Sequence, residues 1–191
     1  MKVAAGIITW EDHPALDNAI ASVRGHVDEV IVVDGLIDGV LPERKGEWRS
    51  QAAKRTATLM EARNRGCDWL LVIDADEQLH RGELLGLLLD TDAPAVALPT
   101  DDGLVSSVRL LRTSYWRCYL VGAHTLQAFD GRVYQLPRHQ LTEKPSIEPV
   151  GPWIEHRPDL RPSWRQQFRL GALAEELEPN DFGKTIPTLA L

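Results

Sequence analysis

Two aspartates that stand one residue apart are the residues of this chain best placed to do chemistry. Asp74 and Asp76 end the apolar run 69–73, which is typical of a strand buried on both faces. Residues i and i+2 of a strand face the same way, so the carboxylates converge if the extended geometry persists. Close carboxylates repel unless a cation or a proton relieves them, and Mg²⁺ and Mn²⁺ prefer such ligands together with substrate phosphates. The pattern predicts a cation–diphosphate site; the alternative is a polar strand end that leads into a turn, where aspartate is common.

Basic side chains for a phosphate-bearing ligand are expected on a helix. Lys54 and Arg55 lie early in a predicted helix at 48–65. The sequence has no Gly-x-Gly-x-x-Gly after its first expected strand and no Gly-x-x-x-x-Gly-Lys-Ser/Thr, so a glycine-rich phosphate loop loses support. The positive charge that binds a phosphate would then come from a metal ion and from these two basic residues. A solvated helix face is the alternative, since Lys and Arg are mostly exposed.

Polar residues also follow the first two expected strands. Thr9, Trp10 and Glu11 come after the first, and Asp34 and Gly35 come after the second. Ligands of open α/β sheets bind at the carboxyl edge of the strands. Asp34 can accept hydrogen bonds from a base or a ribose, and Trp10 could shape the base pocket. The pattern favours a nucleotide, although each residue could instead belong to a loop that caps a helix.

An alternating series of strands and helices is expected to position these residues. Its elements are a strand at 3–9, a helix at 14–23, a strand at 28–34, a helix at 48–65, a strand ending at the aspartates, a helix at 82–90 and a strand at 95–98. Such alternation predicts an α/β fold with a mostly parallel central sheet and helices on both faces.

The second half of the chain has a different pattern. Short strands are expected at 104–112, 119–121 and 125–134, with a turn at 130–132, followed by a loop at 137–152 and a closing helix at 164–177. No linker divides the chain, so 1–191 is expected to form one domain. Residues 1–100 would form the nucleotide-binding half, and residues 101–191 a second half that ends in the closing helix.

Composition sets limits on the class of protein. The hydrophobic fraction of 43% and the charged fraction of 26% are ordinary for a soluble globular chain. No apolar run approaches the about 20 residues of a membrane span. The two cysteines show no metal spacing. Nothing suggests a disulfide framework either, so a cytoplasmic location is expected. The net charge of −7 argues against a broad nucleic-acid-binding surface.

The first 80 or so residues resemble the family 2 glycosyltransferases, which have the GT-A, Rossmann-like fold and transfer sugars from nucleotide-diphospho-sugars. The resemblance rests on six segments: Ile7-Ile8-Thr9-Trp10-Glu11-Asp12, Ser22-Val23, Asp28-Glu29-Val30-Ile31-Val32-Val33-Asp34-Gly35, Asp38-Gly39, Gln51 to Arg55, and Gly66-Cys67-Asp68-Trp69 to Asp74-Ala75-Asp76-Glu77. Weaker similarity continues at Arg109-Leu110-Leu111-Arg112, Gly122-Ala123-His124 and Ile154-Glu155-His156.

This resemblance implies roles for individual residues. Thr9, Glu11 and Asp34 match positions that line a nucleoside pocket, Asp74 a position near the ribose and metal, Asp76 the principal metal ligand, Arg55 a basic position near the donor, and His156 a histidine that can approach the metal or diphosphate. Trp10, Gly35, Lys54 and Ala75 adjoin these positions and complete the expected donor site. The implied cofactor is Mn²⁺ or Mg²⁺, and the implied donor is a uridine-diphospho-sugar in particular.

The base that would deprotonate the acceptor hydroxyl is less defined. Related sequences carry an acidic residue after the histidine of a motif like that at His124, and Thr125 stands there instead. Asp101 and Asp102, in a turn after the strand at 95–98, are the first substitutes, and His124 is the second. Simple turn chemistry is an equally good explanation of the aspartate pair.

The leading hypothesis is therefore a metal-dependent, inverting glycosyltransferase. The alternatives are a degenerate module that binds nucleotide or sugar without turnover, and a nucleotidyltransferase. The acceptor could be a glycan, a protein, a small molecule or a modified nucleic-acid base. Because the chain is short for such an enzyme, a homo-oligomer could complete the acceptor site.

Overall fold

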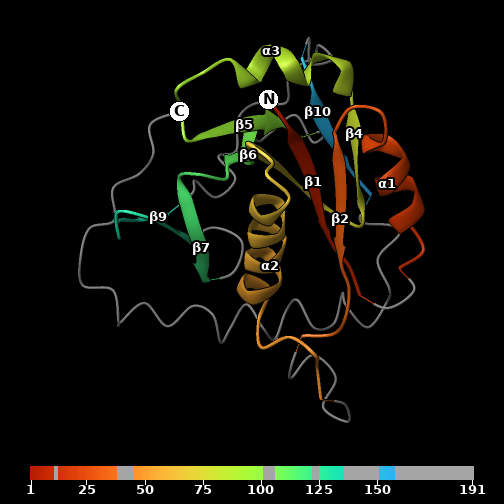
Figure 1. The fold of residues 1–191 in the computed structure, drawn as a ribbon. Coiled ribbons are helices and arrows are strands. Elements are labelled where there is room, and N and C mark those ends of the chain that lie inside the picture. Colours follow the sequence, from red (N-terminus) through yellow and green to blue (C-terminus); the bar gives the residue numbers. More distant parts are fainter. Residues whose placement is uncertain (11–12, 38–44, 101–105, 122–124, 136–150, 158–191) are drawn as a thin grey trace.

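The computed structural model describes residues 1–10, 13–37, 45–100, 106–121, 125–135 and 151–157 (Figure 1). The elements, in chain order, are β1 (Val3–Ile8), α1 (Leu16–Val23), β2 (Glu29–Val33), α2 (Gln51–Asn64), β3 (Trp69–Asp74), β4 (Glu77–His80), the 3₁₀-helix η1 (Gly82–Leu84), α3 (Leu85–Leu89), β5 (Ala95–Pro99), β6 (Ser106–Arg112), β7 (Trp116–Val121), β8 (Thr125–Ala128), β9 (Val133–Gln135) and β10 (Trp153–His156).

These strands form three sheets. The largest has the order β2-β1-β3-β6-β5, in which β1 pairs in parallel with β2 and β3, whereas β6 is antiparallel to both β3 and β5. The other two sheets, β10-β4 and β7-β8-β9, are antiparallel throughout. Among the described residues, none of the helices combines the length and apolar character that a membrane crossing requires.

Two apolar cores flank the central strands, because the side chains of a strand alternate between its faces. On β3, Leu70 and Val72 face a core that is shared with α2 and β7. Trp69, Leu71 and Ile73 face a second core, which also contains residues of α1, α3, β4 and β10. The expectation of a strand buried on both faces is therefore confirmed for residues 69–73, which are all buried.

The predicted fold class is wrong, and with it the resemblance to family 2 glycosyltransferases and their GT-A, Rossmann-like fold. The structure is rich in strands, its sheets are mixed or antiparallel, and only three α-helices occur in the described part of the chain. A parallel sheet flanked by helices on both faces is not what forms. The physical reason is that an apolar run indicates burial but does not specify the direction of the strand beside it.

Individual elements show where the prediction failed. The chain turns at Ala75 and Asp76 and returns as β4, which was not expected and which pairs with β10. The strand expected at 95–98 is β5, but its neighbour is the antiparallel β6. The turn expected at 130–132 is confirmed between β8 and β9, where Gly131 has a φ of +86°. The closing helix expected at 164–177 lies outside the described residues.

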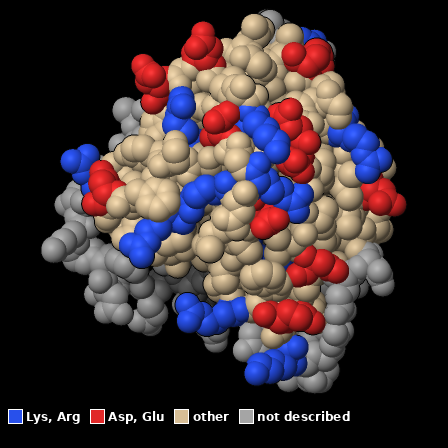
Figure 2. Space-filling view, in the orientation of Figure 1, with Lys and Arg blue, Asp and Glu red and all other residues tan. Residues whose placement is uncertain are grey.

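Charged side chains are distributed without a dominant sign on the face in view. Figure 2 shows acidic and basic side chains interspersed there, in a chain whose net charge is −7.

Candidate functional site

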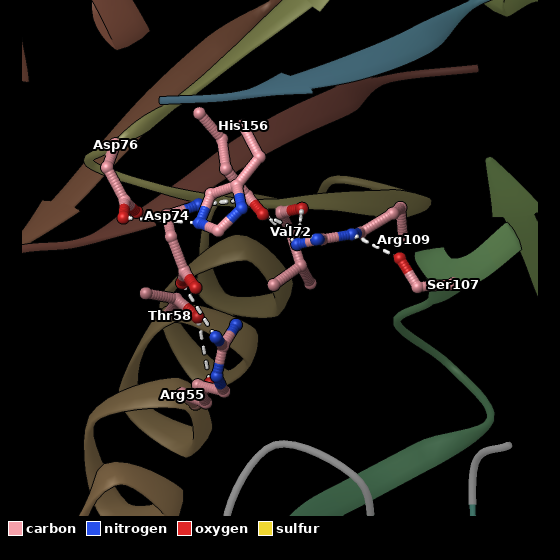
Figure 3. A network of polar contacts seen from close by, with 9 residues as sticks. Arg55, Thr58, Val72, Asp74, Asp76, Ser107, Arg109 and His156 are labelled. Atoms are coloured by element: carbon pink, nitrogen blue, oxygen red, sulfur yellow. Dashed lines mark hydrogen bonds and ion pairs between the residues drawn. The ribbon is translucent and has the colours of Figure 1, made fainter. Parts of the chain in front are cut away.

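Asp74 and Asp76 take different partners at the carboxyl end of β3. Asp74 is the last residue of the strand and lies on the face of Leu70 and Val72, which α2 covers. Its Oδ1 atom accepts a hydrogen bond of 2.6 Å from Arg55 Nη2, and the two side chains are 17% and 5% exposed. Figure 3 shows this carboxylate turned toward Arg55. Asp74 and Arg55, which were each predicted to lie near the donor, therefore form a direct ion pair.

Asp76 belongs to the turn between β3 and β4, and its side chain is completely buried. Its Oδ2 atom lies 3.4 Å from Nε2 of His156, the last residue of β10. Backbone contacts hold the end of β10 against this turn. Arg157 N donates to Asp76 O at 2.8 Å, and His156 pairs in register with Glu77. The structure therefore brings together Asp76 and His156, which are far apart in the sequence (Figure 3).

The loops after β1 and β2 are joined by a buried lysine. Lys54 Nζ donates to Gly35 O at 2.6 Å and also to Thr9 O, and it lies 5.6 Å from the centroid of the Trp10 ring. Lys54 is fully buried, so its ammonium acts on these backbone carbonyls inside the protein. Four of the residues predicted for the donor site are in this way gathered at one place.

Asp34 lies beside this cluster with an exposed side chain. Its backbone oxygen accepts a hydrogen bond of 2.6 Å from Trp48 Nε1, and Leu36 N donates to Glu47 Oε2 at 2.6 Å. These contacts fix the loop after β2 to the segment that precedes α2. The Asp34 carboxylate therefore stands at the carboxyl end of β2, open to solvent.

Two polar atoms inside the site have no hydrogen-bond partner among the described residues. One is the Oγ1 atom of Thr9, which is 1% exposed, and the other is the Nε atom of Arg55, which is 4% exposed. Buried polar groups in native proteins are nearly always hydrogen-bonded, to a ligand or water where the protein offers nothing. Both atoms belong to residues predicted to bind the donor.

Sequence reasoning missed a second ion pair next to the aspartates. Arg109 on β6 donates to both carboxylate oxygens of Glu77, with Nη2–Oε1 at 2.6 Å and Nη1–Oε2 at 2.8 Å. Glu77 Oε2 also accepts the backbone N–H of Asp74 at 2.8 Å. Glu77 belongs to the acidic motif, but no pattern in the sequence identified Arg109, 32 residues later, as its partner.

The pKa values around this pair follow from burial and neighbouring charge. Burial lowers the pKa of Arg109, but the charge of Glu77 and its hydrogen bond outweigh burial, so that the pKa is raised overall. Burial raises the pKa of Tyr119 on β7 to about 12, although Arg55 and Arg109 both oppose this shift. The Tyr119 hydroxyl is therefore neutral at physiological pH and lies within electrostatic range of Arg55, Asp74 and Arg109.

Several predicted residues cannot be placed. Glu11, Asp101, Asp102 and His124 lie outside the described residues, so the candidate bases remain predictions. In the described ranges, no group of three or more His, Cys, Asp or Glu side chains is arranged to hold a metal ion. At the end of β3, Asp76 lies against His156 and Asp74 lies against Arg55, and these described residues do not form a closed metal cage by themselves.

The arrangement combines carboxylate oxygens with a guanidinium at the edge where parallel strands end. Carboxylates attract a hard cation, and a guanidinium matches the geometry of a phosphate. No protein-family model matches this chain, and no curated protein matches it either.

Proposed function

We propose that this protein is a transferase that depends on a divalent cation and moves a sugar from a nucleotide-diphospho-sugar to a hydroxyl acceptor. The observation that carries the proposal is the pair Asp74 and Asp76 at the carboxyl end of β3, with Arg55 bound to the first and His156 beside the second. Asp74 pairs in register with Ile8 at the end of β1, which in turn pairs with Val33 at the end of β2, so the carboxylates lie beside the residues that follow these strands.

The residues present fit a cation such as Mn²⁺ or Mg²⁺. These ions take oxygen ligands and are often held by one or two carboxylates, with substrate phosphates completing the coordination. Asp76 and Asp74 would supply the protein oxygens, with His156 as a neighbour of Asp76. When bound, the cation would stabilise the negative charge that develops on the leaving diphosphate.

Arg55 and Asp34 would orient the rest of the donor. The Nε atom of Arg55 has no partner in the described part of the chain, so it can donate to a phosphate oxygen while Nη2 holds Asp74. The exposed carboxylate of Asp34 can accept hydrogen bonds from a base or a ribose, and we propose uridine as the base. Thr9 offers its buried hydroxyl to the same ligand.

The acceptor side is less defined by the described residues. An inverting transfer requires a base within hydrogen-bond reach of the acceptor hydroxyl, and Asp101, Asp102 and His124 remain the candidates for it. We also propose a cytoplasmic location, which the two free cysteines Cys67 and Cys118 support because disulfides are rare there.

The test is a transfer assay with Mn²⁺ and a panel of nucleotide-diphospho-sugars, in which both donor hydrolysis and transfer to added acceptors are measured. Asp76→Asn keeps the side-chain volume but removes the charge, and we expect it to lower turnover by about 100-fold or more. Asp130→Asn, in the turn between β8 and β9, is the matched control and should leave turnover unchanged.

Two outcomes would contradict the proposal. Undiminished turnover in Asp76→Asn would show that the carboxylate pair is not the reacting site. Cation-dependent binding of a nucleotide without any product would instead identify a binding module, one of the alternatives that the sequence left open.

A further inference from the structure

Arg109 and Glu77 form a buried pair directly behind the two aspartates. The side chains are 11% and 5% exposed, and both carboxylate oxygens of Glu77 receive a guanidinium N–H. Bidentate pairs of this kind are stronger and more directional than single ionic contacts. The pair joins β6 to β4, two strands that belong to different sheets.

Two further donors of Arg109 also face acceptors of the protein. Its Nε atom donates to Ser107 Oγ at 2.7 Å, and Nη1 approaches Val72 O at 3.5 Å (Figure 3). The guanidinium is thus surrounded by protein acceptors and is not presented to a ligand. Whatever Arg109 contributes to the site, it contributes through Glu77.

Glu77 acts on the aspartates through the backbone. Its Oε2 atom accepts the N–H of Asp74 at 2.8 Å, which fixes the peptide where β3 ends. Its own backbone pairs in register with His156, the residue that lies against Asp76. Glu77 therefore contacts the end of β3 through its side chain and the strand that carries His156 through its backbone.

The negative charge of Glu77 is buried close to two other carboxylates and therefore requires a counter-charge. Residues 74–77 contain three carboxylates, and without Arg109 the negative charge of Glu77 would have no counter-charge in this pair. With Arg55 and Arg109 present, the two guanidinium groups leave one net negative charge among the three carboxylates. A divalent cation then reverses that charge and makes the site attractive to a diphosphate.

We propose that Glu77 and Arg109 are positioning residues for the carboxylates of Asp74 and Asp76, and that they set the affinity of the site for a divalent cation. Glu77 holds the Asp74 peptide, and Arg109 keeps Glu77 in that position and neutralises it. The inference rests on the proposed function, because it assigns a cation to the aspartate pair.

The experiment compares two double variants that remove the buried charges together. Replacing a whole buried ion pair with neutral groups of similar size is often neutral for stability, whereas removing one partner is strongly destabilising. Glu77→Met with Arg109→Met removes the acceptor of the Asp74 N–H. Glu77→Gln with Arg109→Met retains a carbonyl oxygen at the same place, so the two proteins differ at position 77 alone, where only Gln offers a strong acceptor.

Stability is measured by urea unfolding, and Mn²⁺ binding is measured by electron paramagnetic resonance of the free ion, with the metal alone. We expect both double variants to fold, and we expect the Met/Met protein to bind Mn²⁺ about 10- to 100-fold more weakly than the wild type, as is typical when an outer partner of a metal ligand is lost. The Gln/Met protein should recover most of that affinity.

Equal affinity in the wild type and both folded variants would overturn the inference, since the pair would then be structural only. Equal weakening in both variants would also overturn it, because the loss would not follow the acceptor at position 77. If the Met/Met protein does not fold, Arg109→Lys takes its place, as it keeps the charge but cannot form the bidentate pair. Unchanged Mn²⁺ affinity in that variant would contradict the proposal.

A wild-type protein that binds no Mn²⁺ alone would overturn the inference as well. The proposed transfer reaction is judged separately by the assay with nucleotide-sugars, where the diphosphate contributes ligands of its own. Failure of the positioning role and failure of the proposed function are therefore distinguishable.

Discussion

Neighbouring residues on α2 place their charges in different surroundings. Lys54 sends its ammonium to the backbone oxygens of Thr9 and Gly35, whereas Arg55 binds the carboxylate of Asp74. Successive residues of a helix differ in direction by about 100°, so two adjacent basic residues reach two different strand ends. Lys54 thus fixes the loops around the site, and Arg55 contributes to its charge.

The buried phenol of Tyr119 is expected to make the stability of the folded protein depend on pH in the alkaline range. Burial raises its pKa to about 12, above its ordinary value of 10. Below pH 10 both the folded and the unfolded state keep the proton, whereas between about pH 10 and 12 only the folded state does, so stability falls as pH rises. We expect Tyr119 to contribute about 1.4 kcal/mol to that fall for each pH unit.

Tyr119→Phe should remove this contribution, which urea unfolding at a series of pH values between 9 and 11 would measure. Tyr115, whose pKa is raised to about 12 by its hydrogen bond to Tyr134, contributes to both proteins equally. An unchanged pH slope in Tyr119→Phe would show that the phenol of Tyr119 is not held neutral by burial.

Part of the candidate site, the aspartate pair, could be predicted from the sequence. The types and spacing of Asp74 and Asp76 pointed to the end of a buried strand, and the structure places both at the end of β3. Their partners were harder to foresee. His156 lies on β10, which follows a stretch without a strand pattern, and Arg109 lies on β6, 32 residues after its partner Glu77.

At the scale of elements, the close packing of α2 on β1 is what brings Arg55 to Asp74. Gly6 in β1 makes that approach tight, because a Cβ atom there would lie 2.9 Å from Thr58 Cβ on α2 and 2.8 Å from Leu70 Cδ1 on β3. Both values are shorter than real contacts of a Cβ atom, so a side chain at this position would force the helix or the strand to shift.

Gly6→Ala should therefore destabilise the protein by about 1 to 3 kcal/mol, the usual cost of overpacking a core. Gly86→Ala is the control, since a Cβ atom at Gly86 in α3 meets nothing within 4 Å. Alanine there should be neutral or stabilising by about 0.5 to 1 kcal/mol. Urea unfolding of both variants measures the difference, and equal stabilities would contradict the close packing of α2 against β1.

Element boundaries were more predictable than pairing. The helices expected at 14–23 and 48–65 occur as Leu16–Val23 and Gln51–Asn64, since their periodicity and flanking residues are local signals. The pairing of β5 with β6, and of β4 with β10, depends on residues far apart in the chain. Such contacts leave no local pattern, and the expected loop at 137–152 gave no indication of the strand that follows it.

For the whole molecule, the predicted parallel architecture fails although the central strands were found. β1, β2 and β3 form the expected parallel core of the large sheet, but antiparallel pairing takes over from β6 and in both smaller sheets. Hydrophobic patterning specifies which residues are buried, whereas strand direction is decided by the chain between the strands. The proposed function accordingly rests on the residues at the end of β3 and not on a family fold.

The measurement that tests the central claim most directly is a thermal-shift titration of uridine diphosphate with and without Mn²⁺, on the wild type and on Asp76→Asn. A ligand that binds only the folded state raises the melting temperature by mass action. We predict a rise in the wild type that requires Mn²⁺, and no such rise in Asp76→Asn relative to the melting temperature of that variant without ligand. A rise of the same size without the metal, or in Asp76→Asn, would contradict the assignment of a cation–diphosphate site to these aspartates.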